Sequence, residues 1–174
     1  MSVAFTREGD AEAAAADLPD RPVSAHPNLV TASGLAQIDA ELTAAKAAYA
    51  AAQAGGEIAG DRTAMARATR SLRYWSARRA TAQLVPPGDG GVARFGCTVT
   101  ILRDDGSRAS YRITGEDEAD PAAGRIAYVA PAARALLGKG VGDSAVIAGR
   151  DVEIVAVTSM GTGTSMGTSM GTGG

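Results

Sequence analysis

The sequence predicts an α+β protein: an antiparallel pair of long helices, followed by a small antiparallel β-sheet with one short helix. Apolar residues recur at alternating spacings of three and four between residues 35 and 52, which is typical of a coiled-coil helix. A glycine-rich reversal over 54–61 follows, so the partner helix has to come back along the first. From Phe95 to Ile101, apolar and polar residues alternate, which predicts a half-buried strand.

Composition limits the classes of function. The chain has 174 residues, and 45% are hydrophobic but only 4% are aromatic, so any core is built from small side chains. A net charge of −2 gives no general reason to expect a membrane surface or nucleic acid as the partner. The single cysteine, Cys97, excludes an intrachain disulfide, and we find neither a signal-peptide pattern nor an apolar run long enough for a membrane span. We therefore expect a cytoplasmic protein.

Residues 1–28 are predicted to be a disordered acidic leader. Alanine, proline and acidic residues dominate this stretch, and no hydrophobic period is visible. It has two arginines and five acidic residues, whereas residues 29–85 have seven basic and four acidic residues. This uneven charge says more about contacts than the net charge of the whole chain.

Residues 29–85 are predicted to be a coiled-coil hairpin arm. The first helix is expected to begin near Thr31 or Ser33, both good N-caps, and to end at the glycine pair of the reversal. The second is expected to begin at or just after Asp61 and to run to about Leu84, before two prolines. The two apolar seams comprise Leu35, Ile38, Leu42, Ala45, Tyr49 and Ala52, then Met65, Ala68, Leu72 and Trp75. We interpret Trp75 as a core residue that closes the broad end of the hairpin.

The second helix carries six arginines: Arg62, Arg67, Arg70, Arg73, Arg78 and Arg79. They fit a solvated face whose long side chains cover the alanine seam. They equally fit a surface for phosphates or for an acidic protein, because arginine makes planar bidentate pairs. On the second interpretation, Arg67, Arg70 and Arg73 are candidate RNA contacts.

Residues 86–93 are predicted to be a linker and residues 94–157 a β module. The first two strands of the module turn at Asp104–Gly106. An acidic loop over 115–121 follows, and its carboxylates do not have the spacing of a calcium-binding loop. A third strand is expected over 125–129.

The module continues with a short helix after Pro131, closed by Gly138, and ends with a second hairpin. Residues 158–174 repeat threonine, serine, methionine and glycine, which predicts a disordered low-complexity tail.

Several stretches of this sequence resemble the bacterial GreA/GreB transcript cleavage factors. The similarity is strong over 94–143 and weaker in the arm. The stretches that carry it are Phe95–Leu102, Tyr111–Asp120 (YRITGEDEAD), Ala130–Lys139 (APAARALLGK), Val30–Leu35 and Gly60–Thr63.

The resemblance implies a coiled coil followed by an FKBP-like C-terminal domain that docks on bacterial RNA polymerase at its secondary channel. The docking residues carried over are Ala130, Pro131, Arg134 and Leu136, and those of the arm tip are Gly60 and Asp61. Glu57 lies near the tip, in the reversal, but does not occupy a family position. Asp61 would share a Mg²⁺ ion with the polymerase active site, where a backtracked transcript is cut. The resemblance thus implies a binding factor that is not itself an enzyme and has no cofactor of its own. We expect no small-molecule substrate and no membrane as a partner. The basic second helix makes the nascent RNA 3′ end a candidate contact in the complex with polymerase.

The tip departs from the family pattern. The family carries a second acid three residues after the first, and here that position is Ala64. In the docking segment, Ala130 replaces the usual serine, which is a better N-cap. We therefore expect weak stimulation of cleavage, and the alternative is a non-cleaving or inhibitory regulator of the same channel.

A remote alternative is a peptidyl-prolyl isomerase, suggested only by the implied FKBP-like fold. That activity requires an aromatic-lined pocket, and the β module offers Phe95, Tyr111 and Tyr128.

Overall fold

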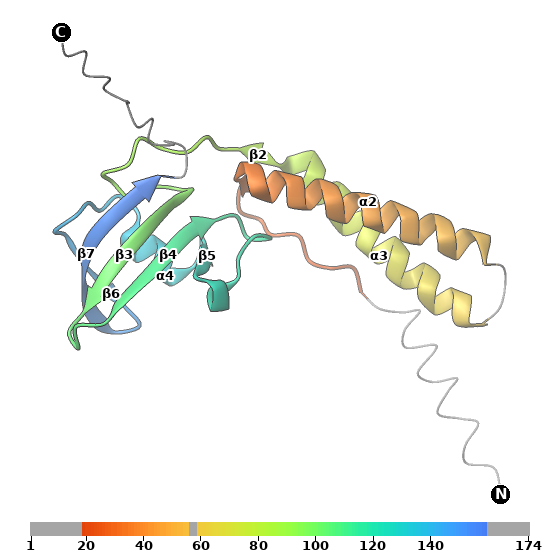
Figure 1. Ribbon diagram of the computed structural model, residues 1–174. Coiled ribbons are helices and arrows are strands. Elements are labelled where there is room, and N and C mark those ends of the chain that lie inside the picture. The colour runs from red at the N-terminus through yellow and green to blue at the C-terminus, as the bar shows by residue number, and fades with distance from the viewer. Residues whose placement is uncertain (1–18, 56–58, 160–174) are drawn as a thin grey trace, which may run out of the picture.

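The computed structural model describes residues 19–55 and 59–159, with the backbone only for residues 59–61. A helical hairpin extends away from a curled β-sheet, and residues 19–28 run beside the hairpin (Figure 1). The predicted α+β class is therefore confirmed. In the part of the chain that the structure describes, no helix is long and apolar enough to cross a membrane.

The arm consists of α2 (Ala32–Ala54) and α3 (Ala59–Thr81). Thr31 caps α2, since its Oγ1 accepts a hydrogen bond from the backbone N–H of Gly34 at 3.1 Å. The predicted seam is confirmed, and the buried residues at its centre are Ile38, Ala45, Ala68 and Trp75. Leu35, Leu42 and Leu72 pack at its edges. Trp75 is buried, so the interpretation of this side chain as a core residue is confirmed.

The end of the second helix was predicted wrongly. α3 stops at Thr81, and Gln83–Leu84 form a short strand, β2, which pairs in parallel with β1 (Leu29–Val30). The side chain of Asn28 donates to the carbonyl of Arg78 at 2.7 Å, and the N–H of Gln83 donates to the carbonyl of Asn28 at 2.8 Å. These bonds, made by a residue just before α2, compete with a further turn of α3, and the periodicity of the sequence does not predict them.

The acidic leader is also corrected in part. Its residues 19–28, which we predicted to be disordered, are packed against the arm and the β domain. Residues 1–18 lie outside the described residues. Two residues of the predicted linker belong to the β domain, because Val92 bridges to Gly140 and Ala93 is fully buried.

The β domain is a five-stranded sheet in the order β5-β4-β3-β7-β6. Its elements are β3 (Cys97–Arg103), β4 (Arg108–Thr114), η1 (Pro121–Ala123), β5 (Arg125–Ala127), α4 (Pro131–Leu136), β6 (Ser144–Ile147) and β7 (Arg150–Ser159). All neighbouring strands are antiparallel except β4 and β5, which corrects the prediction of a purely antiparallel sheet. The acidic loop and η1 form a crossover that lets β5 run in the direction of β4.

The core of the β domain follows the alternation seen in the sequence. Cys97, Val99 and Ile101 of β3 are buried on one face, and Val99 and Ile101 share a core cluster with Ala133 and Leu136 of α4. β7 extends two residues into the predicted tail, because Thr158 and Ser159 pair with Thr98 and Cys97. The rest of that tail, 160–174, lies outside the described residues.

Candidate functional site at the joint of arm and β domain

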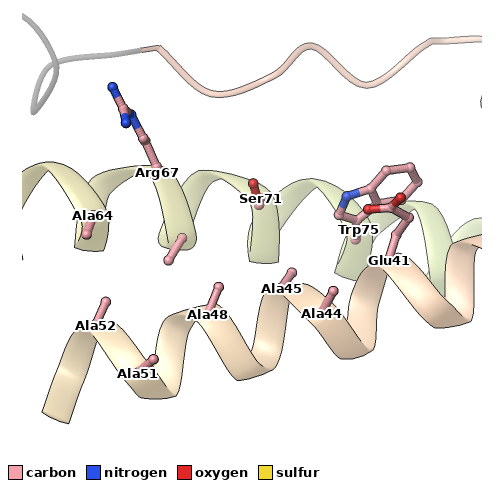
Figure 2. Close-up of a pocket in the computed structure, with 11 residues that line it drawn as sticks. Glu41, Ala44, Ala45, Ala48, Ala51, Ala52, Ala64, Arg67, Ser71 and Trp75 are labelled. Atoms are coloured by element: carbon pink, nitrogen blue, oxygen red, sulfur yellow. The ribbon is translucent and has the colours of Figure 1, made fainter.

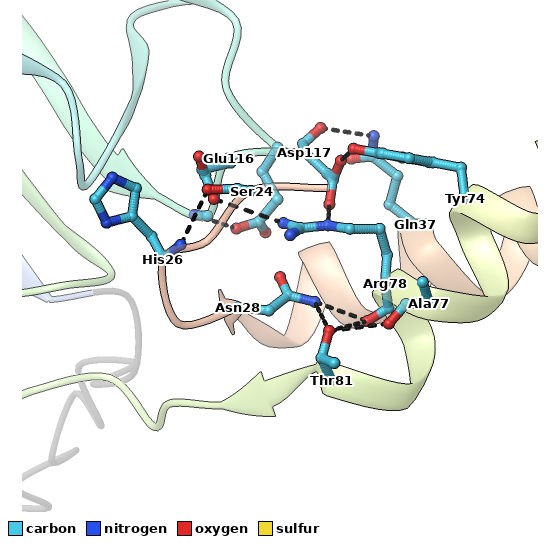
Figure 3. Close-up of polar contacts among 12 residues, drawn as sticks. Ser24, His26, Asn28, Gln37, Tyr74, Ala77, Arg78, Thr81, Glu116 and Asp117 are labelled. Carbon is cyan, nitrogen blue, oxygen red and sulfur yellow. Dashed lines mark hydrogen bonds and ion pairs between the residues drawn. The ribbon is translucent and has the colours of Figure 1, made fainter. Parts of the chain in front are cut away.

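The most developed polar cluster lies where the end of α3 meets the loop between β4 and β5. The side chain of Arg78 is 2% exposed, and its Nε donates to a carboxylate oxygen of Asp117 (Figure 3). Its Nη2 lies 4.0 Å from a carboxylate oxygen of Glu116. The hydroxyl of Tyr74 donates to the other oxygen of Asp117 at 2.5 Å. A buried cation thus faces the predicted acidic loop, and the loop is joined to the arm.

The environment of Tyr74 changes its acidity. Burial, followed by the hydrogen bond to Asp117, raises the pKa of Tyr74 from 10.0 to about 12. Both causes disfavour the phenolate, because burial penalises the charged form and Asp117 accepts the hydroxyl proton in a hydrogen bond. Tyr74 is therefore a neutral hydrogen-bond donor at the joint.

A second acidic residue of the loop holds the start of α2. Glu118 is only 7% exposed, and its carboxylate accepts from the hydroxyl of Thr31 and from the N–H of Gly115 at 3.0 Å. A carboxylate at a helix N-terminus is also favoured by the helix dipole. Gly34 leaves room for it, since an added Cβ would lie 2.2 Å from the Glu118 Cδ. The acidic loop therefore contacts the start of α2 as well as the end of α3.

Three of the carboxylates in the acidic loop are balanced by protein partners. Asp117 and Glu118 have protein partners, and Asp120 pairs with Arg125 at 3.1 Å. Within residues 19–55 and 59–159, no cluster of three or more His, Cys, Asp or Glu side chains is arranged to hold a metal.

The sequence interpretation missed the joint. Arg78 was grouped with the other arginines of α3 as a solvated or phosphate-binding residue, and it is instead the most buried of them that the structure describes. Two signals were present. Polar residues replace apolar ones where the α3 seam should continue, and a strongly acidic loop of opposite charge lies further along the chain. Nothing local connects these two signals, so their pairing was not predicted.

The candidate RNA contacts have three different environments. Arg67 is exposed beside an alanine-lined groove between α2 and α3, a cavity of about 620 Å³ that also contacts Trp75 (Figure 2). Arg70 is half-buried, and its Nε makes no hydrogen bond to the described residues. Arg73 is exposed, and its Nη1 lies 3.3 Å from the carboxylate of Asp20. Of these three candidates, the exposed ones available to an anion are Arg67 and, once it leaves Asp20, Arg73.

The arm tip is described only in part. Glu57 lies outside the described residues. Gly60 and Asp61 belong to the first residues of α3, and their side chains also lie outside the description. Ala64, which stands where the family has its second acid, is exposed one turn further along α3.

The predicted docking segment surrounds the start of α4. Ala130 is its N-cap and makes no side-chain capping bond, while Pro131 and Arg134 are exposed. Leu136 was predicted to contact the polymerase, and this is wrong for a direct contact because its side chain is fully buried. Residues 133 and 136 share the face of α4 that packs on the sheet, so Leu136 positions the helix from inside.

The aromatic side chains of the β domain do not form one pocket. Phe95 and Tyr128 contact each other edge-on, with ring centroids 5.9 Å apart. Tyr111 lies elsewhere, with its hydroxyl 3.2 Å from Arg103, and it lines a separate cavity of about 240 Å³. This arrangement gives no support to the prolyl isomerase alternative.

Comparisons with known proteins find relatives of this chain, and the match to a family model falls on the β domain. The family described as "Transcription elongation factor, GreA/GreB, C-term" matches residues 88–159. "Transcription elongation factor GreA" of Methylobacterium nodulans is 40% identical over 77 residues, which are 41% of this chain and 49% of that protein. The protein of the same description from Hyphomonas neptunium is 50% identical over 60 residues, 34% of this chain and 38% of that protein. The chain thus spans about half, or less, of the length of these curated relatives.

A solved structure, the GreA factor homolog 1 of Thermus thermophilus, aligns with 76% of this chain and 99% of its own. The identity is 19% and the TM-score is 0.37, too low to support the placement of the arm. The family model that matches residues 88–159 supports the family instead, and the curated relatives carry the same description. Residues 88–159 therefore match the GreA/GreB C-terminal domain, and the family is assigned to this part of the chain.

Proposed function

We propose that this protein is a transcription elongation factor that binds bacterial RNA polymerase through its β domain and extends its arm into the secondary channel. One observation carries the proposal: a GreA/GreB C-terminal domain directly follows a helical hairpin. Each helix has 23 residues, so the arm reaches about 35 Å from its base. That reach suits insertion into a channel.

Docking would use the exposed end of α4. Pro131 and Arg134 face solvent there, and Leu136 holds the helix on the sheet from below. Arginine is suited to pair with a carboxylate of a protein partner, which gives Arg134 a direct role in binding.

Stimulation of transcript cleavage is expected to be weak. Mg²⁺ prefers several oxygen ligands, and carboxylates are the common protein donors. At the two family positions of the tip, Asp61 supplies a carboxylate and Ala64 supplies none. The metal would belong to the polymerase, where it activates water, and this chain would contribute one ligand and no cofactor of its own.

The test is cleavage of the transcript in stalled, backtracked complexes of bacterial RNA polymerase. We expect slow shortening that is lost in Asp61→Ala and accelerated in Ala64→Glu. Rapid shortening that is unchanged in Asp61→Ala would contradict the role of the tip. Failure of the full chain to bind polymerase in the same preparation would overturn the proposed function as a whole.

The missing acid at Ala64 also favours a second candidate, a regulator that occupies the channel without supporting cleavage. It predicts no shortening by this protein and slower shortening by an authentic cleavage factor added with it. Contact with the RNA 3′ end is tested separately by crosslinking, which should weaken when Arg67 and Arg73 are changed to glutamate.

A further inference from the structure

Residues 19–28 connect three parts of the molecule at one end. Asn28 is 3% exposed, and it bonds to the end of α3 through the carbonyl of Arg78 and to β2 through the N–H of Gln83. The hydroxyl of Tyr128, in the β domain, donates to the carbonyl of Pro27 at 2.6 Å. This end of the segment is therefore anchored to the arm and to the β domain.

The other end of the same segment lies across α3 and makes exposed contacts. The guanidinium of Arg21 stands 3.6 Å from the ring centroid of Tyr74 and 5.3 Å from that of Trp75. Next to it, Asp20 pairs with Arg73 at 3.3 Å, with side chains 61% and 66% exposed. Both contacts are electrostatic, and both are open to solvent ions.

We propose that residues 19–28 act as an intramolecular clasp. Its inner end, at Pro27 and Asn28, is permanently attached across the joint, and its outer end, at Asp20 and Arg21, opens and closes over the aromatic pair of α3. When closed, the outer end covers the edge of Trp75 and occupies Arg73. When open, it releases both.

The two ends of the clasp respond differently to salt, because the outer contacts are charged and exposed and the inner bonds join neutral groups. Exposed ion pairs are weak, and added salt weakens them further. A cation over an aromatic face is also strongest where water and ions are excluded. The inner bonds join neutral groups, and the bond from Asn28 to the carbonyl of Arg78 is also buried, so salt leaves this end in place. Ionic strength, or an anionic group that binds Arg73, should therefore open the outer end alone.

Trp75 is the single tryptophan of the chain, so its fluorescence reports on the clasp. We would measure quenching by acrylamide, a neutral molecule, in the full chain at about 10 mM and about 500 mM NaCl. Quenching of the native chain should rise with salt. Arg21→Ala should be quenched about twofold more at low salt and should lose the salt dependence. Arg150→Ala, an exposed arginine of the β domain, is the matched control and should behave as the native chain.

A charge swap separates the clasp from general effects of substitution. Asp20→Arg alone should open the outer end by repulsion from Arg73, and Asp20→Arg with Arg73→Asp should restore the native quenching. Circular dichroism checks that each variant is folded. Equal quenching of Arg21→Ala and the native chain at low salt would overturn the clasp, whatever the result of the polymerase assays.

Discussion

Arg78 at the end of α3 and Asp117 in the loop after β4 form a buried ion pair, with side chains 2% and 8% exposed. Tyr74 bonds the same carboxylate, and Glu118 of the same loop holds the start of α2. Both helices of the arm are thus attached to one short acidic loop. These side chains join the arm to the β domain.

Removing the cation should destabilise the protein strongly. Arg78→Ala leaves the Asp117 carboxylate buried without its cation, which is expected to lower the free energy of unfolding by about 3–5 kcal/mol. The neighbouring Arg79 provides a matched control, because its ion pair with Asp39 is 45% and 51% exposed. Arg79→Ala should cost no more than about 1 kcal/mol in the same urea titration. Equal losses of unfolding free energy in the two variants would contradict the role of Arg78 as a buried cation that stabilises the joint.

Close packing against Glu118 makes Gly34 sensitive to a single methyl group. Alanine normally stabilises a helix relative to glycine by about 1 kcal/mol. Here the added Cβ would meet Glu118, which is held by its own hydrogen bonds, so Gly34→Ala should instead destabilise by about 1–3 kcal/mol. At Gly88 the nearest atom to an added Cβ is 3.5 Å away, and Gly88→Ala should change stability by less than about 0.5 kcal/mol. The measurement is the thermal unfolding of both variants. A Gly34→Ala variant that is more stable than the native chain would refute the close contact between residue 34 and Glu118.

Tyr74 should give the protein a stability loss in alkaline solution. Its pKa is about 12 in the folded chain and 10.0 ordinarily, so the unfolded chain releases the proton first. The contribution of Tyr74 is therefore complete below pH 10 and declines as the pH rises toward 12. In an ultraviolet titration, the phenol that ionises near pH 12 should be missing from Tyr74→Phe. Persistence of that step in the variant would assign it to another tyrosine.

Two substitutions in α4 should affect different properties of the protein, one its stability and the other its binding to polymerase. Leu136→Ala removes a fully buried side chain, and we expect a loss of about 2–5 kcal/mol in unfolding free energy. Arg134→Ala changes an exposed residue and should leave the melting temperature nearly unchanged while weakening binding to bacterial RNA polymerase. Native binding by a folded Arg134→Ala variant would remove this residue from the proposed docking surface.

Much of the architecture was predictable because it follows from local patterns. The helical seam around Ile38 and Trp75 and the alternation around Val99 are periodic signals that a short stretch of sequence already contains. The early end of α3 was not predictable in the same way. It depends on Asn28, 50 residues before the carbonyl of Arg78 that it bonds.

For the candidate sites too, the sequence located the segments and the fold showed what each side chain contacts. The α4 segment was found by its motif, but burial assigned different roles to Arg134, at the surface, and Leu136, in the core. The acidic loop was noticed for its charge, and its partners came only with the fold.

By itself, the sequence determined that a helical hairpin precedes a small β domain and that the tip keeps Asp61 but has lost its companion acid at Ala64. Only the tertiary structure decided which arginine is buried. Arg78 and Asp117 are 39 residues apart, and their charges have to be brought together by two different elements before either can be shielded from water. Charge alone does not distinguish an arginine that faces solvent from one that holds a domain joint, because the difference lies in burial.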